Sequence, residues 1–262
     1  MSAQRILVKL GGTLLDHPDS RHSIAAQIAA LASKGGPLVV VHGGGKQMTR
    51  FLDERGVQSQ FVNGLRVTSP DVVDAVLKVF AGSVNKELVA SLIQAGASAV
   101  GLCGVDGALA ESEQLDPQLG AVGRVVKTNP AVLDALVAGG FVPVVACVGG
   151  DRNGNIYNVN ADQMAVACAS GFRADKLLFL TDVKGVLDAA GEILPRLTPA
   201  DCRKLIDDGV AKGGMQAKLE SACAALMNGV GEVVIAPGAE PGVIRRLLAG
   251  EALGTQLGPE TA

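Results

Sequence analysis

The segments ILVKLGG (residues 6–12) and PLVVVHGGG (residues 37–45) each join a short apolar run to consecutive glycines. An apolar run of this length is typical of a strand that is buried on both faces of a parallel sheet. Consecutive glycines let the backbone approach an anion closely, and a following helix adds its positive N-terminal end. Ligands of such sheets bind at the carboxyl ends of the strands. The two segments therefore predict an α/β fold whose binding site lies in the glycine-rich turns.

The rest of the chain continues this alternation of strands and helices. Further strands are predicted at residues 98–102, 141–148, 176–180 and 232–236. Helices are predicted from about residue 20 to 34, from Gly45 to Gly56, from a hydroxyl cap at Ser69 towards Gly96, from Asn129 to Gly139, and near Asn160, Thr198 and Gly214. Residues 107–128 predict hairpins that form a flap over the site, and residues 149–155 predict a turn. The pattern predicts a mostly parallel sheet in a single domain of residues 1–262.

The composition disfavours several classes of protein. Lys and Arg total 23 against 26 Asp and Glu, a net charge of -3, so the basic excess of a nucleic-acid-binding protein is missing. The five cysteines and three histidines show no zinc-ligand spacing, so we expect reduced, buried thiols. The sequence has no uncharged apolar stretch of about 18 residues and no signal-peptide pattern, which predicts a cytoplasmic protein without a membrane partner.

The common nucleotide-binding and hydrolase motifs are absent from the sequence. There is no GxxxxGK(S/T) motif, which excludes a P-loop. Gly43 and Gly45 have the spacing of the dinucleotide motif, but Met48 replaces its third glycine, which disfavours an NAD-binding dehydrogenase. The HGGG stretch has no GxSxG partner, so the nucleophile of an α/β-hydrolase is missing as well.

Polar residues in the second half of the chain are further candidate site residues beside the glycine loops. The segment NVNAD at residues 158–162 supplies two amides and a carboxylate, which would also suit an Asx turn and a helix cap. Lys218 follows Gly213 and Gly214, and we predict it in the first turn of a helix, where its charge opposes the helix macrodipole. This unfavourable position favours a functional role for Lys218.

Taken together, these elements resemble the amino-acid kinase family. The matching elements, in order, are Lys9-Leu10-Gly11-Gly12, VVVHGGG (39–45), NGLRVT (63–68), NVNAD (158–162), TDVKGV (181–186) and Gly214-Met215 with Lys218. The elements NGLRVT and NVNAD are similar to the branch of the family that phosphorylates N-acetyl-L-glutamate. The resemblance implies a three-layer αβα sandwich. It also implies an acceptor-binding part at about residues 1–172 and an ATP-binding part at about residues 173–262.

The resemblance implies that the γ-phosphoryl group of ATP is transferred to the γ-carboxylate of N-acetyl-L-glutamate. Mg²⁺ would be carried mainly by the nucleotide phosphates, with no protein metal ligand. Lys9 would contact the transferred phosphoryl group, Lys218 the leaving side, and Asp162 would hold both ammonium groups. A carboxylate acceptor is already ionised at pH 7 and needs no general base, so we expect His42 to be structural.

The same resemblance assigns the remaining site residues. Backbone N–H groups of the two glycine loops would bind the phosphoryl and γ-carboxylate oxygens. The planar guanidinium of Arg66 suits the α-carboxylate of the substrate. The residues expected to bind the acceptor are Gly44, Gly45, Arg66, Asn158 and Asn160. Those expected to bind ATP are Gly11, Gly12, Thr181, Asp182 and Gly185.

Two further expectations concern regulation and rival functions. Family members that arginine inhibits carry a helix before the first strand, and Lys9 leaves no room for one, so we expect an arginine-insensitive homodimer that pairs through the helix after Ser69. One rival is a kinase of the same family that acts on carrier-linked aminoadipate. The other is a non-catalytic sensor, which would be expected to have lost Lys9, Asp162 or Lys218.

Overall fold

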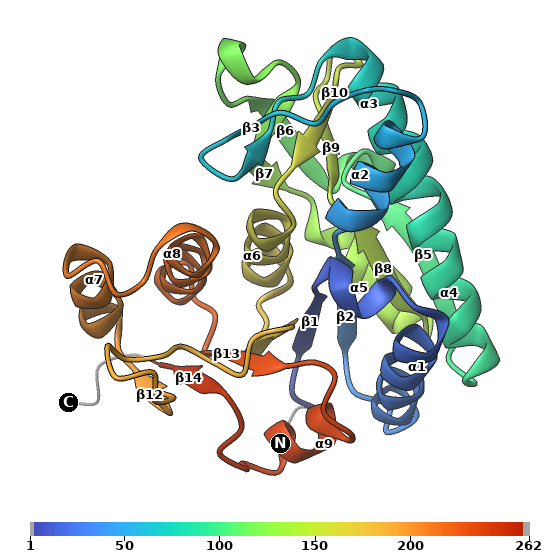
Figure 1. Ribbon diagram of the computed structural model, residues 1–262. Coiled ribbons are helices and arrows are strands. Elements are labelled where there is room, and N and C mark those ends of the chain that lie inside the picture. Colours follow the sequence, from blue (N-terminus) through green and yellow to red (C-terminus); the bar gives the residue numbers. More distant parts are fainter. Residues whose placement is uncertain (1–2, 259–262) are drawn as a thin grey trace.

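A computed structural model describes residues 3–258 and has helices on both faces of one central sheet (Figure 1). The eight strands, in spatial order, are β12 (Arg196–Leu197), β14 (Thr255–Leu257), β13 (Glu232–Pro237), β11 (Lys176–Thr181), β1 (Ile6–Leu10), β2 (Leu38–His42), β8 (Val142–Ala146) and β5 (Ala99–Cys103). The strands from β13 to β5 run parallel, and β14 is antiparallel to β13. The predicted α/β fold with a mostly parallel sheet is confirmed.

Burial explains the apolar runs of the central strands. Every residue of β1 and β2 is buried, because helices cover both faces of the sheet at this point. The predicted strand at residues 141–148 is wrong at its end. β8 stops at Ala146, and Val148 begins β9 (Val148–Gly150), which belongs to a different sheet.

Two helical layers complete the sandwich. The first layer contains α1 (Pro18–Ala32), α4 (Asn85–Gln94) and α9 (Val243–Leu248); the second contains α5 (Pro130–Ala138), α6 (Ala161–Phe172) and α8 (Gly213–Met227), with α7 (Pro199–Asp207) packed against α8. The predicted three-layer αβα arrangement is confirmed. Within residues 3–258, no helix combines the length and the apolar content that crossing a membrane requires.

The helix predicted after Ser69 is continuous but not uniform. It runs through α3 (Pro70–Val76), a π-helical segment at Leu77–Val84 and then α4. The predicted hydroxyl cap is wrong, because the side chain of Ser69 makes no capping hydrogen bond. Pro70 fixes the first turn instead: its ring presets φ, and its missing N–H has no acceptor at the start of a helix.

A second lobe contains short strands outside the main sheet and lies at the top of Figure 1. Its small closed barrel consists of β6 (Ala110–Gln114), β7 (Val122–Thr128), β9 and β10 (Ile156–Val159), and beside it lies the hairpin β3 (Phe61–Val62) and β4 (Leu65–Arg66). β6 and β7 are antiparallel, which confirms the predicted hairpin. The turn at residues 149–155 is also confirmed, because the Asp151 carboxylate accepts hydrogen bonds from the backbone N–H groups of Asn153 and Asn155.

Candidate active site

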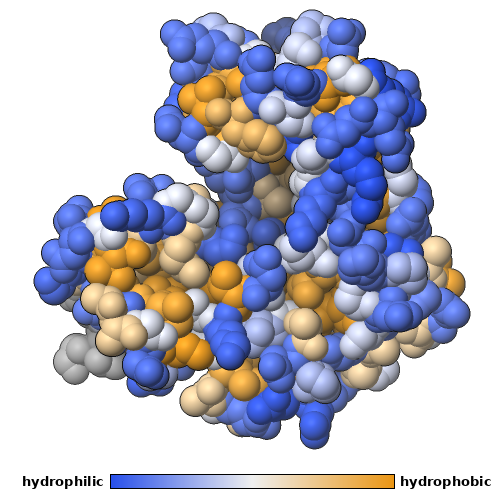
Figure 2. Space-filling view, in the orientation of Figure 1, coloured by the Kyte–Doolittle hydropathy of each residue, from blue (hydrophilic) through white to orange (hydrophobic). Residues whose placement is uncertain are grey.

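A cavity of about 690 Å³ opens at the carboxyl ends of β11, β1 and β2. Figure 2 shows a hollow with hydrophilic walls between the lobe of the small barrel and the lobe that carries α7 and α8. The predicted site residues that line the cavity are Lys9, Gly11, Gly12, Gly45, Arg66, Thr181, Asp182 and Lys218. None of the lining residues lies within 107–128, and the hairpin that borders the cavity is β3–β4.

Lys9 and Lys218 line the base of the cavity, and both pair with Asp162, which is not one of the lining residues. The Lys9 Nζ lies 2.6 Å from Asp162 Oδ1, and the Lys218 Nζ lies 3.3 Å from Asp162 Oδ2. The Lys9 and Asp162 side chains are only 8% and 10% exposed, and Lys218 is 19% exposed. Charges this deeply buried are stable only when they are paired, so the carboxylate fixes both ammonium groups. The three residues come from β1, α6 and α8, far apart in the sequence.

The charge state of Asp162 follows from this environment. Burial favours the neutral carboxylic acid, but the positive charges of Lys9 and Lys218 outweigh it, so the pKa of Asp162 lies below its ordinary value. Asp162 is therefore ionised at neutral pH, and the cluster carries one net positive charge. A site with this charge attracts anions.

The position of Lys218 corrects one prediction. α8 begins at Gly213, so Lys218 lies in the second turn of the helix and not in the first. The macrodipole acts mainly within the first turn, so it does not explain this residue. The ion pair with Asp162 accounts for its buried position instead.

Local structure positions Asp162 at the start of α6. The Asn160 side chain caps this helix by accepting hydrogen bonds from the backbone N–H groups of Asp162 and Gln163. A carboxylate in the first turn also interacts favourably with the helix dipole. Asn160 therefore contributes to the site by holding Asp162 in place, and it is not one of the cavity-lining residues.

The two glycine loops lie against each other at the cavity wall. A Cβ added to Gly12 would lie 3.3 Å from the backbone nitrogen of Gly45 and 3.6 Å from the Cα of Gly44, so a side chain here would push the two loops slightly apart. Gly12 and Gly45 each begin a helical turn, where backbone N–H groups have no acceptor within the helix. These N–H groups suit an anion in the cavity.

Gly11 differs from the prediction for the loop. Its N–H donates to the carbonyl of Leu180 at 2.9 Å and continues the hydrogen bonding between β1 and β11. The prediction that this N–H binds an anion is wrong, because the sheet already uses it. Gly44 precedes α2 (Gly45–Asp53) and packs against the ring of Phe80.

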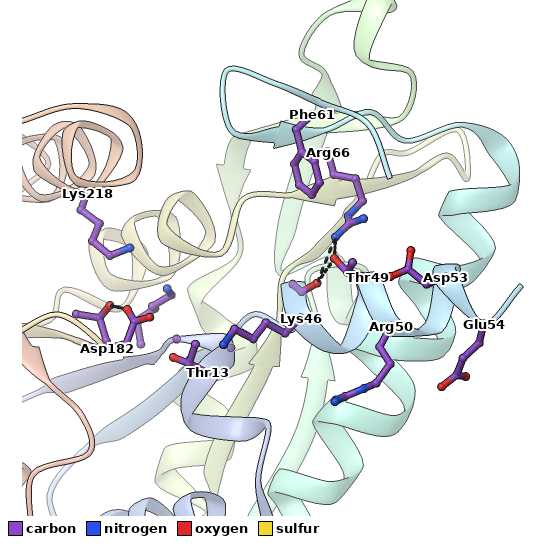
Figure 3. A pocket seen from close by; sticks show the side chains of 15 residues that line it. Thr13, Lys46, Thr49, Arg50, Asp53, Glu54, Phe61, Arg66, Asp182 and Lys218 are labelled. Carbon is purple, nitrogen blue, oxygen red and sulfur yellow. Dashed lines mark hydrogen bonds between the residues drawn. The ribbon is translucent and has the colours of Figure 1, made fainter. Parts of the chain in front are cut away.

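Arg66 lies across the cavity from the lysines, at the end of β4 (Figure 3). Its guanidinium donates to Thr49 Oγ1 at 2.7 Å, to the carbonyl of Gly45 at 3.2 Å, and to the hydroxyl of Ser59. It also lies 4.6 Å from the centre of the Phe61 ring. Burial lowers the pKa of Arg66 from its ordinary value, and the nearby charge of Asp53 acts in the opposite direction. These contacts hold the guanidinium group of Arg66 in one orientation. A guanidinium group has five N–H donors, so some of them remain available to bind a ligand.

Asn158 is held beside this end of the site by the segment that carries Arg66. Its Nδ2 donates to Thr68 Oγ1 at 3.0 Å, and the Thr68 hydroxyl donates to the carbonyl of Arg66 at 2.8 Å. Asn158 is not one of the residues that line the cavity. The structure therefore connects Asn158 to Arg66 through Thr68.

Thr181, the last residue of β11, and Asp182 form one wall of the cavity. Thr181 Oγ1 donates to Asp182 Oδ1 at 3.0 Å. Gly185 lies apart from them and lines a second cavity of about 660 Å³, next to Leu187, Ile193 and Met215. The predicted ATP residues on this loop are therefore divided between two cavities.

His42 is buried in the sheet and does not line either cavity. Its Nε2 lies 3.0 Å from the Nδ2 of Asn85, and its Nδ1 lies 2.9 Å from the carbonyl of Gly43. Burial lowers the pKa of His42 to about 4, so the ring is neutral at pH 7. This environment agrees with the structural role predicted for His42.

Sequence reasoning missed one wall of the cavity, which α2 provides. Its lining residues are Lys46, Thr49, Arg50, Asp53 and Glu54. The signal was present in the sequence, since positions 46, 49, 50 and 53 recur at the spacing of one helix face. Arg50 also ties this helix to the turn after Gly12, because its guanidinium lies 2.6 Å from Asp16 Oδ1.

The chain matches known proteins over most of its length. Residues 4–237 match the model of the amino acid kinase family. A Solibacter usitatus protein named acetylglutamate kinase is 64% identical over 253 residues, which cover 97% of this chain and 98% of that protein.

Solved structures show the same fold. A Streptococcus mutans protein superposes with a TM-score of 0.84 at 32% identity, with 97% of this chain and 98% of that chain covered. The N-acetylglutamate synthase of Neisseria gonorrhoeae, solved with coenzyme A and N-acetyl-glutamate, superposes with a TM-score of 0.89 at 25% identity and covers 100% of this chain and 61% of its own. The matched region contains Lys9, Asp162 and Lys218, which the fold brings together in two ion pairs. This chain belongs to the amino acid kinase family.

Proposed function

We propose that the chain transfers the γ-phosphoryl group of ATP to the γ-carboxylate of N-acetyl-L-glutamate, giving ADP and N-acetyl-L-glutamyl 5-phosphate. The observation that carries the proposal is one cavity with the Lys9–Asp162–Lys218 cluster at its base and Arg66 across from it. The 64% identity to a protein named acetylglutamate kinase supports the choice of acceptor.

The reaction brings two anions together, so charge stabilisation is the main task of the protein. Lys9 contacts the transferred phosphoryl group, and Lys218 contacts the side of the leaving ADP. Asp162 holds both ammonium groups at a fixed separation. Loss of one such charge typically costs about 2.7–4 kcal/mol in the transition state, a factor of roughly a hundred to a thousand in turnover.

No general base is needed, because the attacking carboxylate is ionised at neutral pH. The carboxylate oxygen attacks the γ-phosphorus, the bond to the bridging oxygen of ADP breaks, and no proton moves. The cavity lining contains no histidine, which supports this assignment. The N–H groups of Gly12, Gly44 and Gly45 bind the oxygens of the phosphoryl group and the acceptor carboxylate.

The acceptor is oriented by Arg66, whose remaining N–H groups bind its α-carboxylate. Asn158 assists from the same end of the site, and Asn160 supports Asp162. These residues belong to the acceptor-binding part of about residues 1–172.

ATP extends from the first cavity past Thr181 and Asp182 into the second. Gly185 lies in the wall of the second cavity, where exposed Leu187 and Ile193 provide an apolar surface for a base. These residues belong to the ATP-binding part of about residues 173–262.

The described residues fit a Mg²⁺ ion that arrives with the nucleotide. They contain no group of three or more His, Cys, Asp or Glu side chains that would hold a metal alone. Mg²⁺ commonly binds through one or two carboxylates together with substrate phosphates, and Asp182 is a carboxylate in the cavity wall. When bound, the ion would neutralise phosphate charge.

The proposal includes a cytoplasmic homodimer. The five cysteines are free thiols, which supports a reducing compartment. β5 is an edge strand of the main sheet, and Ile93 of α4 and Phe141 before β8 are exposed apolar residues. An open edge and exposed apolar side chains support a second copy as the partner.

The test is ATP-dependent hydroxamate formation, in which hydroxylamine traps an acyl phosphate. The purified protein is incubated with ATP, Mg²⁺, hydroxylamine and one acid at a time: N-acetyl-L-glutamate, N-acetyl-L-aspartate, N-acetyl-L-2-aminoadipate or free L-glutamate. We expect hydroxamate with N-acetyl-L-glutamate. A preference for the aminoadipate derivative would overturn the acceptor, and ATP binding without hydroxamate from any acid would favour a sensor.

A further inference from the structure

The cavity lining contains five cationic side chains and three carboxylates, Asp53, Glu54 and Asp182. Its cationic lining residues are Lys9, Lys46, Arg50, Arg66 and Lys218. Lys9 and Lys218 share Asp162, Arg50 pairs with Asp16, and Arg66 donates to Thr49 and lies in the field of Asp53.

Lys46 has no such partner. Within residues 3–258, none of the ion pairs or side-chain hydrogen bonds of the cavity wall involves its ammonium group. It is the second residue of α2, where a positive charge opposes the helix dipole and is therefore unfavourable. No contact within the described chain therefore accounts for a positive charge at position 46.

The direction of the side chain supplies the explanation. Figure 3 shows Lys46 extended from the start of α2 across the cavity towards Thr13, and both residues line the cavity. Thr13 follows Gly12, and Lys46 follows Gly45, so this side chain spans the junction of the two glycine loops. Lys9 and Lys218 reach the same cavity from β1 and α8.

We propose that Lys46 is a third phosphate-binding cation, which contacts the γ-phosphoryl group of ATP from the α2 side, while Lys9 contacts this group from the other side and Lys218 contacts the side of the leaving ADP. The inference rests on the proposed function for the identity of the donor. Lys46 contributes charge and a hydrogen bond, and no bond to it forms or breaks. ADP lacks the γ-phosphoryl group, so Lys46 discriminates between ATP and ADP.

The experiment compares the binding of ADP and of a non-hydrolysable ATP analogue with an imido β,γ-bridge, both with Mg²⁺, by titration calorimetry without acceptor. The variant is Lys46→Met, and Lys46→Arg keeps the charge. Lys34→Met is the matched control, because Lys34 is an exposed lysine that does not line the cavity. The unfolding temperature of each variant is measured beside its binding.

We expect Lys46→Met to weaken binding of the analogue by at least about tenfold, since it removes a hydrogen bond between two charged groups. ADP binding should change less than about twofold, Lys46→Arg should restore most of the analogue affinity, and Lys34→Met should match the parent. Equal effects on ADP and the analogue, or no effect on either, would overturn the proposal. A selective loss of analogue affinity in a protein that makes no hydroxamate would support Lys46 and overturn the proposed acceptor instead.

Discussion

Replacement of Asp162 by Asn removes the anion that Lys9 and Lys218 share and changes little else in shape. The Lys9 ammonium then remains in a position that is 8% exposed, without its partner at 2.6 Å. Removal of one member of a buried ion pair typically costs about 3–5 kcal/mol of stability. Lys218 is 19% exposed and can turn towards solvent, so we expect a value near the lower limit, about 3 kcal/mol.

A second substitution separates this cause from a general loss of packing. In the variant Asp162→Asn with Lys9→Met, the buried charge is gone, so we expect about 2 kcal/mol of the lost stability to return. Turnover should not recover together with stability in the double variant. Asp162→Asn should lower turnover by about a hundredfold, and the double variant should lower it further, because a phosphoryl-binding charge has been lost as well.

The assay is urea unfolding at pH 7.5 together with hydroxamate formation for the parent, both single variants and the double variant. Asp74→Asn is the control, because the Asp74–Lys78 ion pair is exposed and should contribute only about 0.3–0.5 kcal/mol. A cost below about 1 kcal/mol for Asp162→Asn, or no recovery in the double variant, would refute the reasoning about a buried, shared carboxylate.

Three further predictions follow from the site and its surroundings. Arg66→Lys should raise KM for N-acetyl-L-glutamate by at least about tenfold with kcat nearly unchanged, because lysine lacks the planar fork; a rise in KM for ATP alone would show that the two ends of the cavity are reversed. Because the pKa of His42 falls from 6.5 to about 4 on folding, the unfolded chain binds more protons between these values, so stability should fall by about 3 kcal/mol as the pH drops through this window. Urea unfolding should show a shallower fall for His42→Gln, and equal slopes would contradict the assignment. Gly44→Ala should lose about 1–3 kcal/mol, since its Cβ would lie 2.9 Å from the Phe80 ring, whereas Gly45→Ala meets nothing within 4 Å and should be nearly neutral in thermal unfolding.

β1 and β2 were predictable because they are mostly apolar and lead directly into consecutive glycines. The end of β8 was not, because the apolar run continues through Cys147 and Val148 without a turn residue. The transfer of Val148 to the small barrel depends on pairing with residues of β10 further along the chain. Periodicity in one segment does not contain that information.

The base of the site was more predictable than its walls. Lys9, Asp162 and Lys218 belong to separate motifs, and the expectation that they meet came from the family resemblance, which the ion pairs support. Gly11 was misjudged because a glycine sequence does not tell which N–H groups the sheet already uses. The role of α2 was missed, although Lys46 and its neighbours on one helix face follow the second glycine loop directly.

The most direct test of the central claim follows an oxygen atom from the acceptor carboxylate into phosphate. The protein is incubated with ATP, Mg²⁺, hydroxylamine and N-acetyl-L-glutamate labelled with ¹⁸O in its γ-carboxylate, and the released phosphate is examined by mass spectrometry. We predict a single heavy oxygen in each phosphate, because the carboxylate attacks phosphorus and hydroxylamine then breaks the carbon–oxygen bond. Phosphate without the label would mean that water is the nucleophile, and it would contradict the proposed reaction.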